Sequence, residues 1–181
     1  CPAPTPAASN ASTTSTPLTA MPIASIPSGR YAEPLQVIFS CATPGAEIRL
    51  RFDGTIPDQN DSLYTQPLDI QQTTIVRARA FAPDYAAGRA ASCSYMFVAP
   101  HTFPIVSLVF DPDDFFDSTS GIYTHAIELS NVEVPANATW IQTDGQLGFS
   151  ADVAVEPFGS GSLALPQKSL LLKTQPAFGA Q

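Results

Sequence analysis

Four of the arginines fall at alternating positions of two short segments, and this spacing suits them to bind an anion. They are Arg49 and Arg51 in the first segment, and Arg77 and Arg79 in the second. Residues two apart on a β-strand point to the same face of the sheet. If the two strands are neighbours, the four guanidinium groups line one face, which could dock a polyanion or the acidic surface of a neighbouring copy. The alternative is an ordinary solvated sheet face.

Carboxylates gather in a second stretch of the chain, and hard cations such as Ca²⁺ take several carboxylate oxygens. The members are Asp111, Asp113, Asp114 and Asp117. Their spacing is not that of an EF-hand loop, and helix capping explains the first three without a metal. A second acidic loop holds Asp53, Asp58 and Asp61. Both are candidates for calcium, and we predict no resident metal.

The sequence predicts no catalytic activity and no cofactor. His101 and His125 have no nearby partner of recognised spacing. GxSxG, HExxH, Walker and GxGxxG elements are absent. The Gly-Ser-Gly-Ser stretch at 159–162 lacks the Gly-Lys-Ser/Thr that a phosphate loop requires.

Two of the three cysteines are expected in the core. Cys41 shares a strand face with Val37 and Phe39, and Cys93 shares one with Tyr95 and Phe97. A disulfide between them would close a loop of about fifty residues, worth roughly 3–4 kcal/mol in the chain-entropy model. We predict this disulfide, and the alternative is two buried free thiols.

Short alternating strands must position these side chains. Period-2 patterns predict strands at 35–41, 47–52, 74–82 and 92–98, separated by turn signals. Further strands are predicted at 105–110, 152–156 and 169–173, with an Asp144-Gly145 hairpin between 140–143 and 147–149. Asp111-Pro112 predicts a helix start. The predicted fold is therefore all-β, an antiparallel immunoglobulin-like β-sandwich plus a second small β-rich unit.

Composition excludes several classes of protein. Across 181 residues the apolar content is 44%, enough for a packed core, while 18 prolines disfavour long helices. The net charge of -8 argues against nucleic-acid binding. No apolar run is long enough to span a bilayer, so a membrane is expected as a partner only through a lipid.

The N-terminal 28 residues have the composition of an extended arm or tether. Residues 2–28 are rich in Pro, Ala, Ser and Thr, and no charge precedes Arg30. A first residue Cys1 before such a tether resembles the mature end of a bacterial lipoprotein, which implies lipidation of Cys1. The alternatives are a fragment boundary or a cysteine paired with another chain. Residues Leu18–Ile26 could grip a sheet edge, either of this sandwich or of another chain.

Three of the four asparagines lie in N-glycosylation acceptor patterns. They are Asn10, Asn60 and Asn137. The pattern is meaningful in an archaeon or a eukaryote and says little in most bacteria.

Residues 27–98 resemble the chitobiase/β-hexosaminidase C-terminal-type module, a small immunoglobulin-like sandwich. The residues that carry the resemblance include Tyr31, Pro34-Leu35-Gln36-Val37, Thr43-Pro44-Gly45-Ala46-Glu47-Ile48, Asp53-Gly54-Thr55-Ile56-Pro57, Tyr64, Pro67, Thr74-Ile75-Val76-Arg77-Ala78 and Ser94-Tyr95. The resemblance implies a spacer or accessory domain of a cell-surface protein, without catalysis.

Residues 103–173 are similar to the opening of a CotH-type protein, the spore-coat kinase-like family. The similarity lies in the segments 103–117, 121–123 and 166–170. The family's arginine is missing from the turn before Pro166, and the kinase-like body would lie beyond Gln181. Kinase activity is therefore not carried over to this chain.

Together these features predict three regions: an arm at 1–28, the sandwich at 29–100 and a CotH-like segment at 101–181. We expect a non-catalytic, secreted or cell-surface structural module that meets a protein partner or its own copies. The alternatives are a subunit of an extracellular filament joined through the arm, an N-terminal fragment of a CotH-like kinase, and a carbohydrate-binding accessory domain. Trp140 and Tyr123 are the candidate sugar-stacking aromatics.

Overall fold

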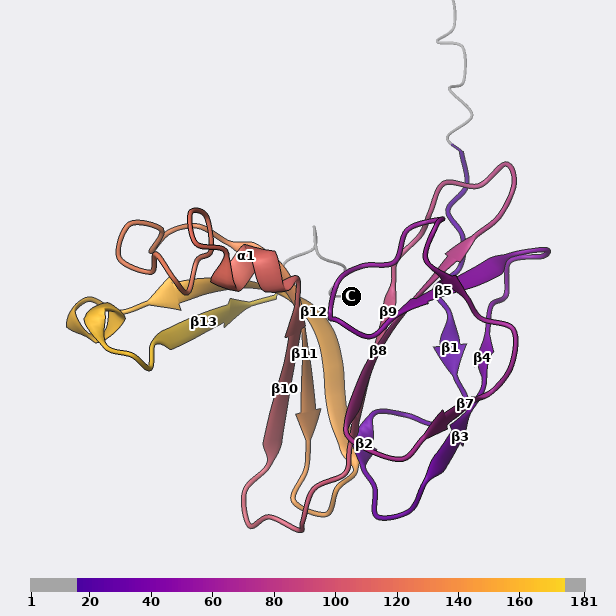
Figure 1. Cartoon of the computed structure of the whole chain (residues 1–181), viewed down its shortest axis with the longest axis horizontal. Helices are drawn as coiled ribbons and strands as arrows, with labels where there is room; N and C mark the ends of the chain where they lie inside the picture. Colours follow the sequence, from indigo (N-terminus) through magenta and orange to yellow (C-terminus); the bar gives the residue numbers. More distant parts are fainter. Residues whose placement is uncertain (1–15, 175–181) are drawn as a thin grey trace, which may run out of the picture.

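The protein consists almost entirely of β-strands, arranged in two units that lie side by side (Figure 1). The computed structural model describes residues 16–174. The first unit holds β1 to β9, and the second holds β10 to β13 with one short helix, α1. The predicted all-β class and its antiparallel sheets are confirmed. Within the described range, no helix has the length and apolarity needed to cross a bilayer.

The larger sheet of the first unit has five strands. Its order is β2 (Gly29–Arg30), β9 (Ala91–Met96), β8 (Thr74–Phe81), β5 (Glu47–Arg51) and β6 (Ser62–Leu63). Two small ribbons face it, β1 (Ile23–Ala24) with β4 (Phe39–Ser40), and β3 (Leu35–Val37) with β7 (Leu68–Ile70). The predicted strand at 35–41 is therefore split, and its halves pair with different partners.

Alternation along the strands places the core of this unit. Ile48 and Leu50 of β5 point inward, where they meet Val76 of β8 and Cys93 of β9. The intervening residues of β5 and β8 are mostly charged, so one face of the sheet is apolar and the other polar. Phe39 and Tyr64 add an edge-to-face aromatic pair, with ring centroids 5.8 Å apart.

Residues 17–28, which the sequence assigned to the arm, pack on this chain's own sandwich. Leu18 forms a parallel bridge with Ala86, and β1 pairs with β4. The buried Thr19 hydroxyl donates to the carbonyl oxygen of Ala80 at 2.9 Å and accepts from the backbone N–H of Gly88 at 2.8 Å. The expectation that Leu18–Ile26 run against a sheet edge is therefore confirmed for this sandwich.

The second unit is a four-stranded antiparallel sheet. Its order is β10 (Ile105–Phe110), β11 (Val134–Ile141), β12 (Leu147–Phe158) and β13 (Ser169–Lys173). A 3-10 turn at Gly161–Ala164 precedes β13. The hairpin predicted at Asp144-Gly145 joins β11 to β12, with Gly145 at φ +92. β12 is longer than predicted, because 147–149 and 152–156 belong to one strand.

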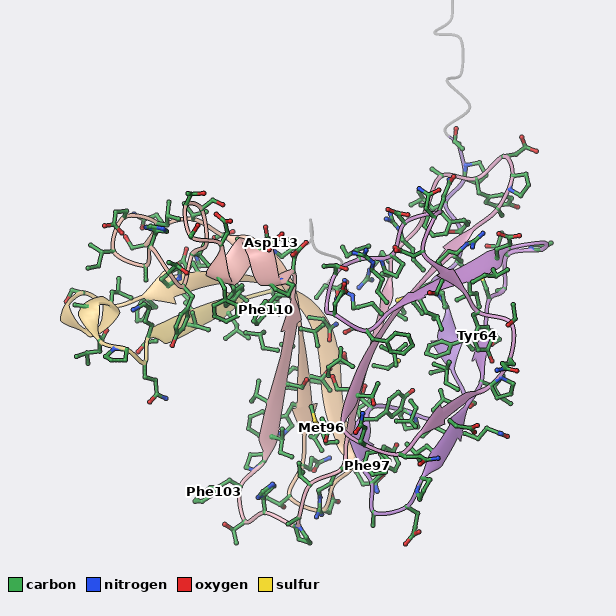
Figure 2. The ribbon with its side chains drawn as sticks, viewed as in Figure 1. Tyr64, Met96, Phe97, Phe103, Phe110 and Asp113 are labelled. Carbon is green, nitrogen blue, oxygen red and sulfur yellow. The ribbon has the colours of Figure 1, made fainter. Side chains whose placement is uncertain are left out.

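Helix α1 (Pro112–Phe116) covers part of one face of this sheet. Asp111 caps it by accepting from the backbone N–H of Asp113 at 3.0 Å. Phe115 stacks on Phe110 with ring centroids 3.6 Å apart, and Figure 2 shows Phe110 beneath the helix. The core here joins Phe115 and Ile122 to Val134, Val153 and Val155.

The two units contact each other at several points. Ser94 of β9 and Ser107 of β10 share a buried hydroxyl hydrogen bond of 2.8 Å. At one end of the interface the backbone N–H of Arg30 donates to the carbonyl oxygen of Gly145 at 2.9 Å. A Cβ added at Gly54 would collide with the carbonyl oxygen of Phe110. The outer face of the five-stranded sheet is therefore partly covered by the second unit.

Candidate functional site: an arginine cleft between the two units

A cavity lies between the two units. Its volume is about 570 Å³, within the range of small-molecule sites. Strands β5 and β8 and the β5–β6 loop form one wall, and β10, β11, β12 and the start of α1 form the other. The charged lining residues are Arg51, Arg77, Arg79, Arg89, Asp111, Asp114 and Asp152.

The two strands that carry the four arginines are neighbours, as expected. Arg51 lies directly opposite Arg77, and Arg49 directly opposite Arg79, in the antiparallel register of β5 and β8. Three of these side chains line the cleft, while Arg49 lines a separate, shallower pocket beside Glu47. The second unit forms the opposite wall at Arg51, Arg77 and Arg79, so this part of the sheet face is a cleft rather than an open surface.

Arg77 is the most buried of these arginines. Its side chain is 7% exposed, and its Nε has no hydrogen-bond partner among the described residues. Burial lowers the pKa of its guanidinium, and the nearby Asp152 carboxylate partly opposes that effect. A desolvated cation with an unused donor is costly unless something negative meets it.

Asp152 is already engaged by other groups. Its Oδ2 accepts from Arg89 at 2.6 Å, and its Oδ1 accepts from the Asn137 amide at 3.0 Å. Sequence reasoning missed both Arg89 and Asp152, since Arg89 lies outside the alternating segments and Asp152 belongs to a distant strand. No local pattern indicates that the two residues meet.

The other cleft arginines are held by their own neighbours. Arg51 Nε donates to Asp61 at 2.9 Å, and the hydrogen bond to Asp61 raises the pKa of Arg51. Arg79 donates to the carbonyl oxygens of Gly88 and Ala87, at 2.9 and 3.2 Å. These contacts fix both side chains without help from a ligand.

The acidic residues act mainly in local structure. Asp111 caps α1, and Asp117 accepts from the backbone N–H and hydroxyl groups of Thr119 and Ser120, which hold its pKa well below the usual range. Burial raises the pKa of Asp114, helped by the neighbouring charges of Asp111 and Asp113. Among residues 16–174 no group of three or more His, Cys, Asp or Glu side chains could hold a metal ion.

The remaining predicted sites are placed as follows. Cys93 is buried and Cys41 half-buried against the same core, as strand parity predicts, but both are free thiols and the predicted disulfide is not formed. The Cys41 thiol instead contacts the carbonyl oxygen of Ala20, in the segment that joins the sandwich, at 3.3 Å.

The glycosylation candidates differ from one another. Asn60 lies in an exposed turn, whereas Asn137 is 5% exposed and its amide bonds to Asp152. A glycan on Asn137 is therefore incompatible with this fold. Cys1 and Asn10 lie outside the described residues.

Comparison with known proteins gives one match. The family model of the chitobiase/beta-hexosaminidase C-terminal domain matches residues 26–92. That range covers the sandwich from the end of β1 to the start of β9, and the matched domain is an immunoglobulin-like, non-catalytic accessory domain. No curated protein and no solved structure matches the chain. This match supports the resemblance of the first unit to the chitobiase-type module. The CotH-type resemblance of residues 103–173 has no support among these matches.

A second surface feature lies on the far side of the second unit. Trp140 of β11 and Phe149 of β12 are cross-strand neighbours whose rings are nearly parallel, 8° apart, with centroids 6.3 Å apart. Val106 of β10 pairs with Trp140, and both Val106 and Phe149 are about half exposed. We call these three residues the aromatic strip.

Proposed function

We propose that this chain is a non-catalytic accessory and interaction module of a secreted or cell-surface protein. The match of residues 26–92 to a chitobiase-type accessory domain carries the proposal. We also propose that a lipid on Cys1 anchors the protein and that the protein assembles into an extracellular polymer. Both of these proposals rest on the sequence alone.

We further propose that residues 103–173 form the N-terminal part of a CotH-type protein. Two stretches that carry this resemblance come together in the second unit. The Tyr123 hydroxyl donates to the carbonyl oxygen of Pro166 at 3.2 Å and accepts from the backbone N–H of Lys168 at the same distance. The Lys168 ammonium also lies over the Tyr123 ring, 5.4 Å from its centroid.

Assays with ATP test the absence of catalysis. We expect calorimetry to show no ATP binding and radiolabelled ATP to transfer no phosphoryl group to protein substrates. ATP-dependent labelling above that of a heat-denatured control would contradict the proposal.

The aromatic strip favours carbohydrate binding as a second candidate function. Sugars present flat C–H faces that pack on exposed aromatic rings. Few of the large aromatic side chains described here are exposed and also lie beside a second aromatic ring. The Trp140 and Phe149 rings lie nearly parallel on the same sheet face as α1, at the end of the strands away from the helix. Tyr123, the other candidate, makes an edge-to-face contact with Phe116 and is less available.

Tryptophan fluorescence tests this candidate directly, because Trp140 is the only tryptophan. N-acetylglucosamine oligomers are the first probe, given the name of the matched family. We expect a saturable change that Phe149→Ala reduces at least tenfold. Phe158→Ala is the matched control, since Phe158 is equally exposed, at 55% against 54%, and lies on the same strand. Equal losses in the two variants would argue against the aromatic strip.

A further inference from the structure

We propose that the cleft between the two units binds the carboxylate of a small anionic molecule, with Arg77 as the group that receives it. This inference concerns a different site from the aromatic strip and does not depend on it. It also holds whether or not the chain has catalytic activity, so this inference and the proposed function can fail independently of each other.

The first argument is the state of Arg77. A guanidinium group offers five N–H donors, and in proteins it stays charged. Here the side chain is 7% exposed and lines the cleft, while its Nε–H meets no acceptor among the described residues. Buried polar groups nearly always have a partner, and Arg49 shares the unused Nε donor but is less buried than Arg77 and lies outside the cleft. The Arg77 Nε is itself shielded from solvent, so the ligand meets the guanidinium where Arg77 lines the cavity.

The second argument is that neighbouring acids do not supply this acceptor. The two carboxylate oxygens of Asp152 accept from Arg89 and Asn137. The acids paired with Arg51, which are Asp53 and Asp61, do not line the cavity. Asp111 and Asp114 also line the cavity, and neither is a hydrogen-bond partner of the Arg77 Nε.

The third argument is charge balance. Arg89 is paired with Asp152 and Arg51 with Asp61, so Arg77 and Arg79 are the lining arginines for which the described residues show no ion pair. One carboxylate would compensate Arg77, because Arg79 is held by backbone carbonyl oxygens. A polyanion would meet Asp111, Asp114 and Asp152 at close range, where like charges repel strongly. The cleft therefore favours a single negative group over a phosphorylated or sulfated polymer.

The fourth argument concerns the shape of the ligand. A planar carboxylate can accept two parallel hydrogen bonds from a guanidinium fork, which adds geometric selectivity to the charge. Beside the arginines lie Ile56, Val109 and Phe110, which provide apolar surface for the body of the molecule. A cavity of about 570 Å³ accommodates a molecule of the size of an acidic monosaccharide.

Calorimetry with D-glucuronate as the probe tests the proposal on the full chain. We expect saturable binding by the wild-type protein and at least a tenfold loss of affinity in Arg77→Met, which keeps the length of the side chain but removes the charge and the donors. Arg49→Met is the matched control, because Arg49 lies on the same sheet face but outside this cleft. The control variant should bind as the wild type does.

Two further ligands and one further variant sharpen the test. The methyl ester of glucuronate has nearly the same shape without the charge, and it should not bind. Arg77→Lys keeps the charge but loses the two parallel N–H donors of the guanidinium group, so it should bind glucuronate several-fold more weakly. This variant provides the test if Arg77→Met does not fold. The proposal is overturned if the wild type shows no saturable binding or if the ester binds as well as the acid. It is also overturned if Arg49→Met and Arg77→Met lose the same amount of affinity for glucuronate, or if inorganic phosphate binds more tightly than glucuronate.

Discussion

At the scale of single residues, Cys93 and Tyr95 lie in the interior of the sandwich, Tyr31 packs against it half-buried, and all three resist ionisation. Burial raises the pKa of the Cys93 thiol and of both tyrosine hydroxyls, and the proximity of Cys93 adds to the shift of each tyrosine. Tyr95 donates to the carbonyl oxygen of Ile26 at 3.0 Å, and Tyr31 donates to that of Pro27 at 2.7 Å. Ionisation would remove these donors and leave a buried negative charge.

We therefore predict that alkali destabilises this protein through these groups. Each has a higher pKa in the folded state than in the unfolded state, so the folded state holds its proton more tightly. The resulting stabilisation is complete well below about pH 8.5, where an exposed thiol is half ionised, and is lost as the pH rises through and above that value. Urea unfolding between pH 7 and 10.5 should show a decreasing free energy of unfolding.

Substitution of the thiol separates its share of this effect. Cys93→Ala should flatten the decrease with pH, whereas Cys41→Ala leaves the buried cluster in place and should keep the wild-type slope. A slope that is the same in both variants would show that Cys93 does not contribute.

At the scale of elements, the segment 17–28 closes the sandwich although its composition is that of a linker. Its order comes from specific hydrogen bonds rather than from a strong apolar pattern. Ser28 accepts from the backbone N–H of Ser94 at 3.0 Å, and the Thr19 hydroxyl bridges Ala80 and Gly88. Backbone groups of β8 and of the segment before β9 are satisfied by this segment.

Thr19→Val tests the role of this segment with little change in shape. The substitution leaves the Gly88 N–H without its acceptor in a buried position, which should lower the free energy of unfolding by about 1–3 kcal/mol. Thr74→Val is the control, because the Thr74 hydroxyl bonds to the Gln72 carbonyl in an exposed position, and it should change stability by less than about 0.5 kcal/mol. Equal effects in chemical denaturation would mean that the segment contributes little.

At the scale of the whole molecule, one of the contacts between the units depends on a glycine in the β5–β6 loop. Gly54 has a φ of +94, and any Cβ there would meet the backbone of Phe110 in β10. The Asp53 carboxylate accepts from the backbone N–H of Thr55 at 3.0 Å, which shapes the turn. The same loop borders the arginine cleft.

We predict that Gly54→Ala destabilises the protein beyond the cost of its backbone conformation. Gly45→Ala is the matched control, since Gly45 also has a positive φ, +67, but nothing lies within 4 Å of an added Cβ. The free energy of unfolding of the control should fall by about 1–2 kcal/mol, because alanine is disfavoured in the left-handed conformation. Gly54→Ala should lose at least about 1 kcal/mol more, because a backbone clash cannot relax without moving the units apart. Denaturation followed by Trp140 fluorescence measures both, and equal losses would contradict the contact.

Much of each element was predictable from sequence, because its signal is local. Alternation in Glu47–Arg51 and Thr74–Phe81 determines which side chains share a face, whatever the strands later meet. Asp53-Gly54 and Asp144-Gly145 specify turns through their own backbone preferences. Thus the all-β class, most strands, the cap at Asp111 and a shared face for the four arginines were predictable, whereas the register that places Arg51 opposite Arg77 was not.

Only the tertiary structure decided what those faces meet. Arg77 has the sequence signature of an exposed strand position, but the second unit buries it. Its acidic neighbour Asp152 lies 75 positions away, and the contact between them depends on how two sheets pack, which no local pattern encodes. Residues 17–28 and the two free thiols show the same division. Alternation along a strand determines which face a side chain takes, whereas packing between segments far apart in the sequence determines its partner.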